Sequence, residues 1–178
     1  MTNPAIVGCS TYRDNIAYVV EPLPMMDTFC KKISDDLKRL GKDYPKTVIF
    51  CRPALFLIRK KYFCSTEGHL HVIIATTAFR MGIDCPDIRM IYHWGPPATL
   101  EEYAQETGQA GRDTLLSKAF LFSKALGKFV SDDVKKYIEN SSICRRKLMY
   151  EQFIFNESLH TQNGICCDIC CKISSELV

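Results

Sequence analysis

The sequence lacks three features that would each point to a class of protein. It has no run of eighteen or more apolar residues, so we expect no membrane span. No basic stretch followed by an apolar segment opens it, so secretion is not indicated. A net charge of +3 is too small to argue for nucleic acid by itself. With 47% hydrophobic and 24% charged residues, the chain can form a core, and we expect an intracellular protein with one domain, or one domain and a small appendage.

Cysteine is abundant, with ten residues in a chain of 178. Without a secretory signal, disulfides are not the favoured interpretation. Five cysteines are scattered singly and are expected to be small buried hydrophobes or free thiols: Cys9, Cys30, Cys51, Cys64 and Cys85. The other five lie in the last 35 residues, and this clustering indicates a metal site: Cys144, Cys166, Cys167, Cys170 and Cys171.

Strand and helix patterns alternate along the chain. Short β-branched and aromatic runs predict strands over 15–21, 47–51, 72–76, 88–92 and 119–122. Apolar residues at spacings of three and four predict a helix over 24–40, which Gly41 would end. This order favours an α/β fold with a mainly parallel sheet and flanking helices.

Three further helices have predicted starting points. Thr99 and Glu102 form a capping box, so a helix should begin at about Leu100. Ser131 is expected to cap a helix whose first turn is acidic, and Cys144 stands at the start of another. The composition changes near 131, which we take as a domain boundary.

Two segments indicate specific chemistry. Residues 75–86 leave a buried strand for a loop with Gly and Pro, and residues 105–113 follow the capped helix. Each places glycine where a backbone must approach a ligand closely, and Arg112 offers a fork of donors that matches phosphate oxygens. In isolation each segment has a simpler interpretation, in which Gly108 and Gly111 end a helix and Arg112 is a solvated charge. The occurrence of both, in this order, favours the functional interpretation.

Both segments resemble motifs V and VI of superfamily 2 helicases, in the form used by RecQ enzymes. Residues 47–52 resemble motif IV, and residues 13–16 resemble the junction before the second RecA-like lobe. The resemblance implies a linker at 1–16, a RecA-like lobe at 17–130 and a helical zinc-binding module at 131–178. It implies ATP-driven 3′-to-5′ DNA unwinding by a nuclear protein of DNA repair and recombination. ATP and Mg²⁺ would be shared with a first RecA-like lobe.

The resemblance also assigns residues to the nucleotide. Arg112 would reach the γ-phosphate as an arginine finger, and Asp84 would face the ribose, although a turn aspartate before a proline is the simpler interpretation. Gly82 would keep its loop close to the ligand. The remaining nucleotide contacts would come from Gln105, Gly108 and Gly111.

DNA phosphates would be held by Arg52 with Thr76 or Thr77. Such contacts do not depend on base sequence and weaken with salt. A solvated arginine and a strand-end threonine are the alternative interpretation. The partner is expected to be single-stranded or forked DNA.

The C-terminal cysteines resemble the RecQ zinc module, in which one cysteine precedes a tight group of three. Structural zinc takes four Cys or His ligands in a tetrahedron. The predicted Zn²⁺ ligands are Cys144, Cys166, Cys167 and Cys170. The usual gap before Cys167 is absent, so Cys171 or His160 would substitute if adjacent cysteines cannot both bind. A redox-sensitive tail without metal is the alternative.

The sequence departs from the family's pattern at three places. Gln109 stands where the family has arginine, which removes one of two charges facing the phosphate, and Arg80 stands where glycine is usual. Only twenty residues separate Cys51 from Val72, room for one crossover helix, whereas RecQ lobes carry an additional strand and helix there. The lobe is therefore expected to be internally shortened.

The parts that a first lobe supplies are not found in the sequence. No Gly-x4-Gly-Lys-Ser/Thr phosphate loop occurs, and no Asp-Glu-x-His sequence offers a carboxylate for Mg²⁺. Because phosphoryl transfer depends on both, we expect the chain alone not to hydrolyse ATP. A non-catalytic DNA-binding or interaction remnant of such a helicase is the alternative function. A product that does not fold stably is a third hypothesis.

Overall fold

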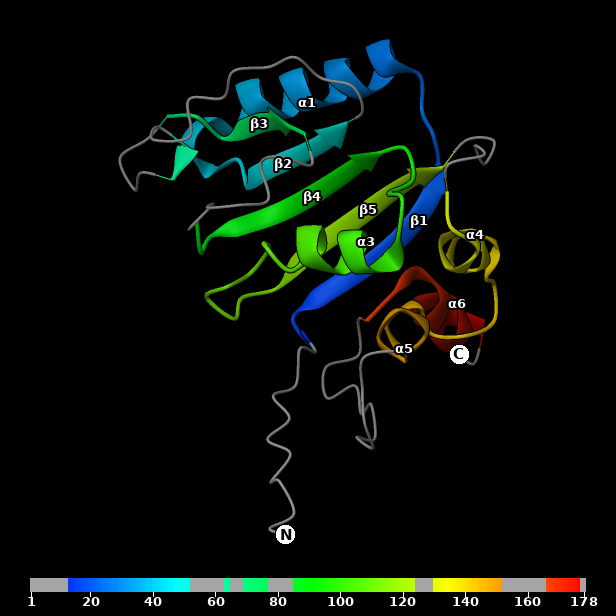
Figure 1. Ribbon diagram of the computed structural model, residues 1–178. Helices are drawn as coiled ribbons and strands as arrows, with labels where there is room; N and C mark the ends of the chain where they lie inside the picture. The colour runs from blue at the N-terminus through cyan, green and yellow to red at the C-terminus, as the bar shows by residue number, and fades with distance from the viewer. Residues whose placement is uncertain are drawn as a thin grey trace, which may run out of the picture.

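The computed structural model describes residues 13–51, 63–64, 69–76, 85–123, 130–151 and 166–176. Its centre is a five-stranded parallel sheet in the order β1-β5-β4-β2-β3 (Figure 1). The strands are β1 (Ile16–Pro22), β2 (Lys46–Cys51), β3 (Val72–Ala75), β4 (Ile88–Trp94) and β5 (Ser117–Ser123). The predicted α/β fold with a parallel sheet is confirmed, and all five predicted strands are present.

The two faces of the sheet are covered by different helices (Figure 1). Helix α1 (Met26–Leu40) ends at Gly41, as predicted, and its Phe29 ring lies 5.1 Å from the Tyr92 ring in an aromatic cluster on one face. Helix α3 (Leu100–Thr107) packs Tyr103 into the core of the other face. Because alternate side chains of a strand point to opposite faces, β4 serves both clusters.

Helix α3 begins at the predicted capping box. The Oγ1 of Thr99 accepts a hydrogen bond from the Glu102 N–H at 3.1 Å. The Glu102 carboxylate reaches back to the N–H of Ala98 at 2.7 Å, one residue earlier than in the usual box. The loop between β4 and α3 is thereby fixed at the helix N-terminus.

Helix α4 (Asp132–Glu139) begins after Ser131, but the predicted side-chain cap is wrong. The Ser131 hydroxyl is buried and has no partner among the described residues. The residue is fixed instead by its backbone N–H, which donates to the Ala98 carbonyl at 3.0 Å. Asp132 and Asp133, in the first turn, interact favourably with the helix dipole.

The C-terminal helices lie beside β1, at the edge of the sheet (Figure 1). They comprise α4, α5 (Arg145–Tyr150) and α6 (Asp168–Glu176). The Tyr18 N–H of β1 donates to the Cys166 carbonyl at 3.1 Å, and the hydroxyls of Tyr18 and Tyr150 lie 3.2 Å apart. Buried residues of these helices therefore share one core with the sheet. The boundary predicted at 131 stays a prediction.

Strands β2 and β3 are direct neighbours, with Thr47 opposite Val72. Most of the connection between them lies outside the described residues, so the predicted internal shortening remains a prediction. Within the described ranges, none of the helices has the length and apolar character that crossing a membrane requires.

Candidate functional site

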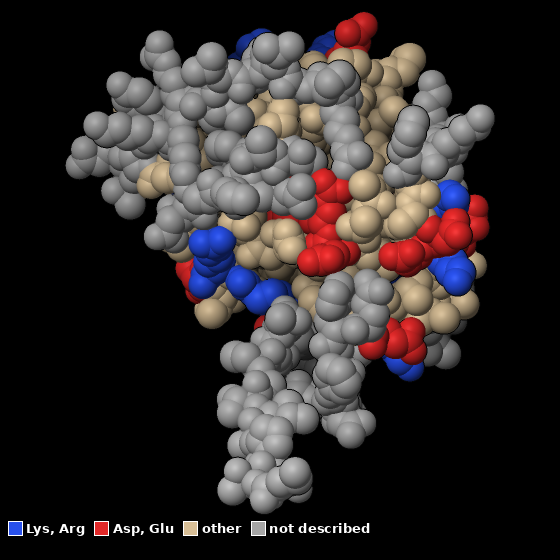
Figure 2. All heavy atoms as spheres, in the orientation of Figure 1, with Lys and Arg blue, Asp and Glu red and all other residues tan. Residues whose placement is uncertain are grey.

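Arg112 lies in the loop that follows α3. The helix ends at Gly108, and the side chains of Gln105 and Arg112 are exposed on either side of that end. The guanidinium of Arg112 donates to Oε1 of Gln109 at 2.5 Å. On the face drawn in Figure 2, Lys and Arg side chains gather near this loop. The guanidinium of Arg112 is thus accessible to a ligand from solvent.

Gly111 is required by the packing of this loop. Its φ is +56°, and a Cβ at this position would lie 2.4 Å from Nδ2 of Asn15 and 2.7 Å from the Leu115 carbonyl. Its N–H donates to the Ile88 carbonyl at 2.8 Å. The close approach that we predicted for a glycine here is therefore made to the chain's own atoms. At Gly108 an added Cβ would lie 3.0 Å from a backbone carbonyl, so that position is also tight.

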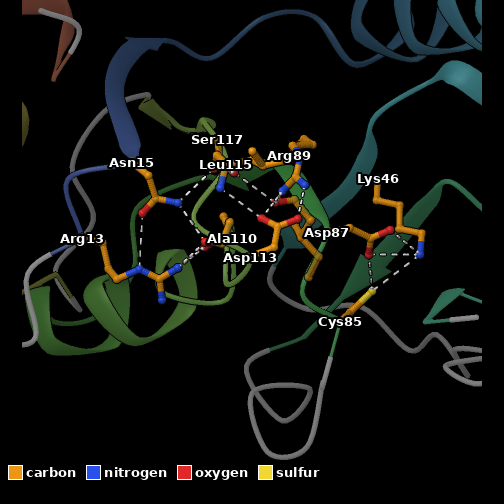
Figure 3. Close-up of polar contacts among 12 residues, drawn as sticks. Arg13, Asn15, Lys46, Cys85, Asp87, Arg89, Ala110, Asp113, Leu115 and Ser117 are labelled. Atoms are coloured by element: carbon orange, nitrogen blue, oxygen red, sulfur yellow. Dashed lines mark hydrogen bonds and ion pairs between the residues drawn. The ribbon is translucent and has the colours of Figure 1, made fainter. Parts of the chain in front are cut away.

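Two ion pairs fix the chain at the start of β4 (Figure 3). Arg89 pairs with Asp113, directly after Arg112, and its hydrogen bond lowers the pKa of the Asp113 carboxyl. The Nζ of Lys46 lies 2.9 Å from Oδ2 of Asp87. Burial alone would raise the pKa of the Asp87 carboxyl, but hydrogen bonds from Lys46 and Cys85 outweigh it and lower that pKa.

Of the predicted DNA contacts, the structure describes Thr76, which is half-buried directly after β3, at the C-terminal ends of the strands. The other predicted contacts with DNA and with the nucleotide loop lie outside the described residues: Arg52, Thr77, Gly82 and Asp84.

The C-terminal ends of β2 and β4 border a cavity of about 240 Å³ that the sequence did not predict. Phe50, Cys51 and Trp94 are among the residues that line it, and a buried pair lies beside them: Nε2 of His93 and Oε2 of Glu106 are 2.8 Å apart. The Nδ1 of His93 has no hydrogen-bond partner among the described residues. In parallel α/β sheets, ligands bind outside the carboxyl ends of the strands. Neither residue type nor spacing linked His93 to Glu106 in the sequence.

The four predicted zinc ligands come together in space. The sulfurs of Cys144, Cys166, Cys167 and Cys170 all lie within 4.8 Å of one another. Sulfur atoms are 3.5 Å apart for Cys144 and Cys166, and 4.0 Å apart for Cys166 and Cys167. Zinc–sulfur bonds of about 2.3 Å in a tetrahedron place sulfurs about 3.8 Å apart, so the donor set fits Zn²⁺.

The first turn of α6 brings Cys170 close to Cys167. The sulfur of Cys167 accepts a hydrogen bond from the Cys170 N–H, in the first turn of α6, at 3.4 Å. This returns Cys170 to the side on which Cys166 and Cys144 lie. Cys171 is exposed and outside the cluster, and His160 lies outside the described residues.

The thiols of the cluster influence one another. Burial raises the pKa of Cys166 to about 12. The hydrogen bond with Cys144, and then burial, raise the pKa of Cys167 to about 12, whereas that bond lowers the pKa of Cys144. An ion pair joins α5 to α6 beside the cysteine cluster. Nε and Nη2 of Arg145 lie 2.5 and 2.9 Å from the carboxylate oxygens of Asp168.

The single cysteines follow the simpler interpretation. Among those that the structure describes, Cys30 is exposed and Cys85 is buried, and all are free thiols. The His71 carbonyl accepts from the Thr47 N–H at 2.8 Å, between β2 and β3. In the described part of the chain, the C-terminal cysteines form the only group suited to a metal ion.

Comparison with known proteins agrees with this geometry. The family described as helicase conserved C-terminal domain matches residues 58–114, which include α3 and Arg112. The RecQ-like DNA helicase blm-1 of Caenorhabditis elegans is 36% identical over 122 residues, covering 56% of this chain and 12% of that protein. The ATP-dependent DNA helicase Q-like 2 of Arabidopsis thaliana is 30% identical over 164 residues, 83% of this chain and 22% of that protein.

The ATP-dependent DNA helicase Q1 of Pongo abelii is 33% identical over 124 residues, covering 62% of this chain and 19% of that protein. This chain therefore spans less than a quarter of the length of these relatives. The matched residues include 75–86 and 105–113, the two segments that resemble motifs V and VI. Together, the matches and the fold show that this chain belongs with the RecQ-type superfamily 2 helicases, as a C-terminal lobe of that type.

Proposed function

We propose that this chain is the C-terminal part of the motor of an ATP-dependent, 3′-to-5′ DNA helicase. The observation that carries the proposal is the exposed guanidinium of Arg112 on a tightly fixed loop, within the segment that matches the helicase family. Relatives with this segment are named as DNA helicases of the RecQ type. A nuclear location would suit such a protein.

In this proposal Arg112 acts on a nucleotide that a first RecA-like lobe binds with Mg²⁺. A guanidinium placed at the γ-phosphate offsets the charge that develops during phosphoryl transfer. Asp84 and Gly82 would lie along the nucleotide, together with Gln105 at the end of α3. Residue 109 is uncharged here, so Arg112 would carry this electrostatic role without a second arginine.

DNA would cross the edge at which the strands end, held through its phosphates by Arg52 and by Thr76 or Thr77. Zn²⁺ would be held by the four clustered cysteines and would supply structural crosslinking there. Since Cys166 and Cys167 also contact β1, bound metal would fasten the C-terminal helices to the sheet.

The test is steady-state ATPase of this chain fused behind the first lobe of a RecQ-type relative, with saturating single-stranded DNA. Arg112→Ala should lower kcat by about 10³-fold, the lower end of the effect of an arginine finger, and leave the KM for ATP nearly unchanged. Arg39→Ala removes another exposed arginine, on α1, and should leave kcat within about twofold. Hydrolysis by Arg112→Ala as fast as by the parent fusion would refute the proposal.

A further inference from the structure

Arg13 and Asn15, directly before β1, form hydrogen bonds with the loop that carries Arg112. The Nη2 of Arg13 donates to the carbonyl of Ala110 at 3.1 Å and to that of Gly111 at 2.5 Å (Figure 3). The Nδ2 of Asn15 donates to the carbonyls of Gly111 and Leu115, at 2.8 and 2.9 Å. Two side chains thus hold three carbonyls of one loop, nearly a hundred residues further along the chain.

The two side chains also support each other. The Nε of Arg13 donates to Oδ1 of Asn15 at 3.4 Å, and Asn15 is 9% exposed. The Asn15 carbonyl accepts from the Ser117 N–H at 2.9 Å, where β1 and β5 begin to pair. The contacts of Arg13 and Asn15 with the loop are therefore anchored to the sheet.

A second set of contacts fixes the same segment. Arg146, in α5, donates from Nη2 to the carbonyls of Asp14 and Ile16 at 3.0 and 2.8 Å. Arg146 is 2% exposed, so this anchor is buried in the core. The residues that hold the loop cannot shift without disturbing the sheet or α5.

The backbone of the loop is held on each side of Arg112. On one side Gly111 is bound through its carbonyl and its N–H, and on the other Asp113 is paired with Arg89. The backbone on both sides of Arg112 is fixed, while its side chain is exposed. A group that stabilises a transition state must be held within a fraction of an ångström of its productive position, and a loop free to move would not do so.

We propose that Arg13 and Asn15 are positioning residues for Arg112, which make phosphoryl transfer depend on the segment ahead of β1. This rests on the function proposed above. A shift of that segment would move the Ala110 and Gly111 carbonyls and, with them, the Arg112 guanidinium. Arg13 and Asn15 do not touch the nucleotide in this scheme, and they act through the loop alone.

The first experiment uses the chain itself, by amide hydrogen exchange resolved over residues 108–116. Arg13→Ala should speed exchange of these amides about tenfold or more, because the carbonyl anchors are lost. Exchange in β2 and in α1 should be unchanged. Arg39→Ala, which removes an exposed arginine of α1, should leave all of these rates as in the parent. Unchanged exchange in the Arg13→Ala loop would overturn the inference.

The second experiment measures ATPase in the fusion described above. Arg13→Ala should lower kcat by about tenfold to a hundredfold with the KM for ATP unchanged, the pattern of a displaced group that acts in the transition state. Arg13→Lys can satisfy one carbonyl and should recover part of kcat. It also serves as the test if Arg13→Ala does not fold, because its kcat should then lie below that of the parent at an unchanged melting temperature.

The outcomes separate the two proposals. If Arg112→Ala is slow but Arg13→Ala and Arg13→Lys match the parent, the positioning inference is wrong and the proposed function stands. If Arg112→Ala also matches the parent, the proposed function itself is wrong. A rise in KM with kcat unchanged for Arg13→Ala would make Arg13 a binding residue and also overturn the inference.

Discussion

The guanidinium of Arg112 donates to Oε1 of Gln109, three residues earlier, at 2.5 Å. An arginine at position 109, the residue of the RecQ pattern, has no acceptor and would repel Arg112 instead. Glutamine therefore changes the site in two ways. It removes one positive charge, and it supplies an acceptor that draws the Arg112 guanidinium back toward the end of α3.

Gln109→Arg should raise ATP turnover of the fused protein, by about tenfold. The substitution adds a charge that opposes the charge developing on the phosphate, and it frees Arg112 from its acceptor. The control is Ser34→Arg, which adds the same charge at an exposed position of α1 and should change kcat by less than about twofold. Steady-state ATPase with saturating single-stranded DNA measures both. No gain for Gln109→Arg, or an equal gain for Ser34→Arg, would contradict this explanation.

The cysteine cluster should bind one zinc ion per chain. Cys144→Ser should reduce the bound zinc at least tenfold, because it removes one of four thiolate ligands. Cys30→Ser changes an exposed free thiol on α1 and should leave zinc content unchanged. Elemental analysis of protein purified without chelators gives the stoichiometry. Metal-free parent protein, or full zinc content in Cys144→Ser, would exclude the site.

Removal of zinc should also weaken the contacts between β1 and the segment that contains Cys166 and Cys167. The backbone carbonyl of Cys166 accepts from the Tyr18 N–H, and Cys167 forms a β-bridge with the same residue of β1. Chelation should therefore speed amide exchange at Tyr18 as well as in α6, since metal binding energy in such sites is folding energy.

The sequence predicted most of what is local. Each strand followed from a short β-branched or aromatic run, and the Thr99 box followed from residues three apart, because propensity and capping act over a few residues. The C-terminal cysteines stood out by their clustering, and the choice of four predicted zinc ligands followed from the resemblance to the RecQ zinc module. The contact between the Cys170 N–H and the Cys167 sulfur was not predicted, since it depends on how α6 begins.

Contacts between distant segments could not be predicted in this way. Residues 13–16 resemble a junction between lobes, but nothing in their type or spacing pointed to the carbonyls of Ala110 and Gly111. The same holds for His93 and Glu106, which meet because β4 and α3 pack together. The Ser131 hydroxyl does not cap α4, because a long-range backbone contact with Ala98 fixes that residue. In each case tertiary packing decides the partner.

The Lys46–Asp87 pair should make stability depend on pH in acid. The pKa of Asp87 is lowered in the folded chain, so its contribution is present above the ordinary carboxyl pKa and is lost as pH falls through the folded value. Asp87→Asn should therefore lower the melting temperature at pH 7, and the difference from the parent should shrink as pH falls from about 6 to about 3. The side chain of Asp87 is 42% exposed, so the effect should be small, on the order of 1–3 °C.

The matched control for that pair is Asp35→Asn, at an exposed position of α1. Its melting temperature should differ little from that of the parent at any pH in this range. A difference for Asp87→Asn that stays constant or grows toward acid pH would show that the ion pair does not carry the effect.

Thr114, two residues after Arg112, has a φ of +70° and is the one non-glycine residue with positive φ among the described residues. This left-handed conformation costs about 1–2 kcal/mol for a residue with a Cβ, and β-branching makes it rarer still. The backbone N–H of Thr114 donates to the Gly111 carbonyl at 3.0 Å, so the turn is held by a backbone contact that any residue except proline can make. Its side chain is exposed.

Thr114→Gly should therefore stabilise the chain. The relief of left-handed strain is partly offset by the greater freedom of glycine in the unfolded state, which leaves a net gain of about 0.5–1 kcal/mol. Thr114→Ala keeps a Cβ in the strained conformation and should gain less, and Thr114→Asn should fall between them, because asparagine tolerates this region. Urea unfolding at equilibrium gives the order of the three free energies. If Thr114→Gly were no more stable than the parent, the threonine side chain would have to make a favourable contact that outweighs its backbone strain.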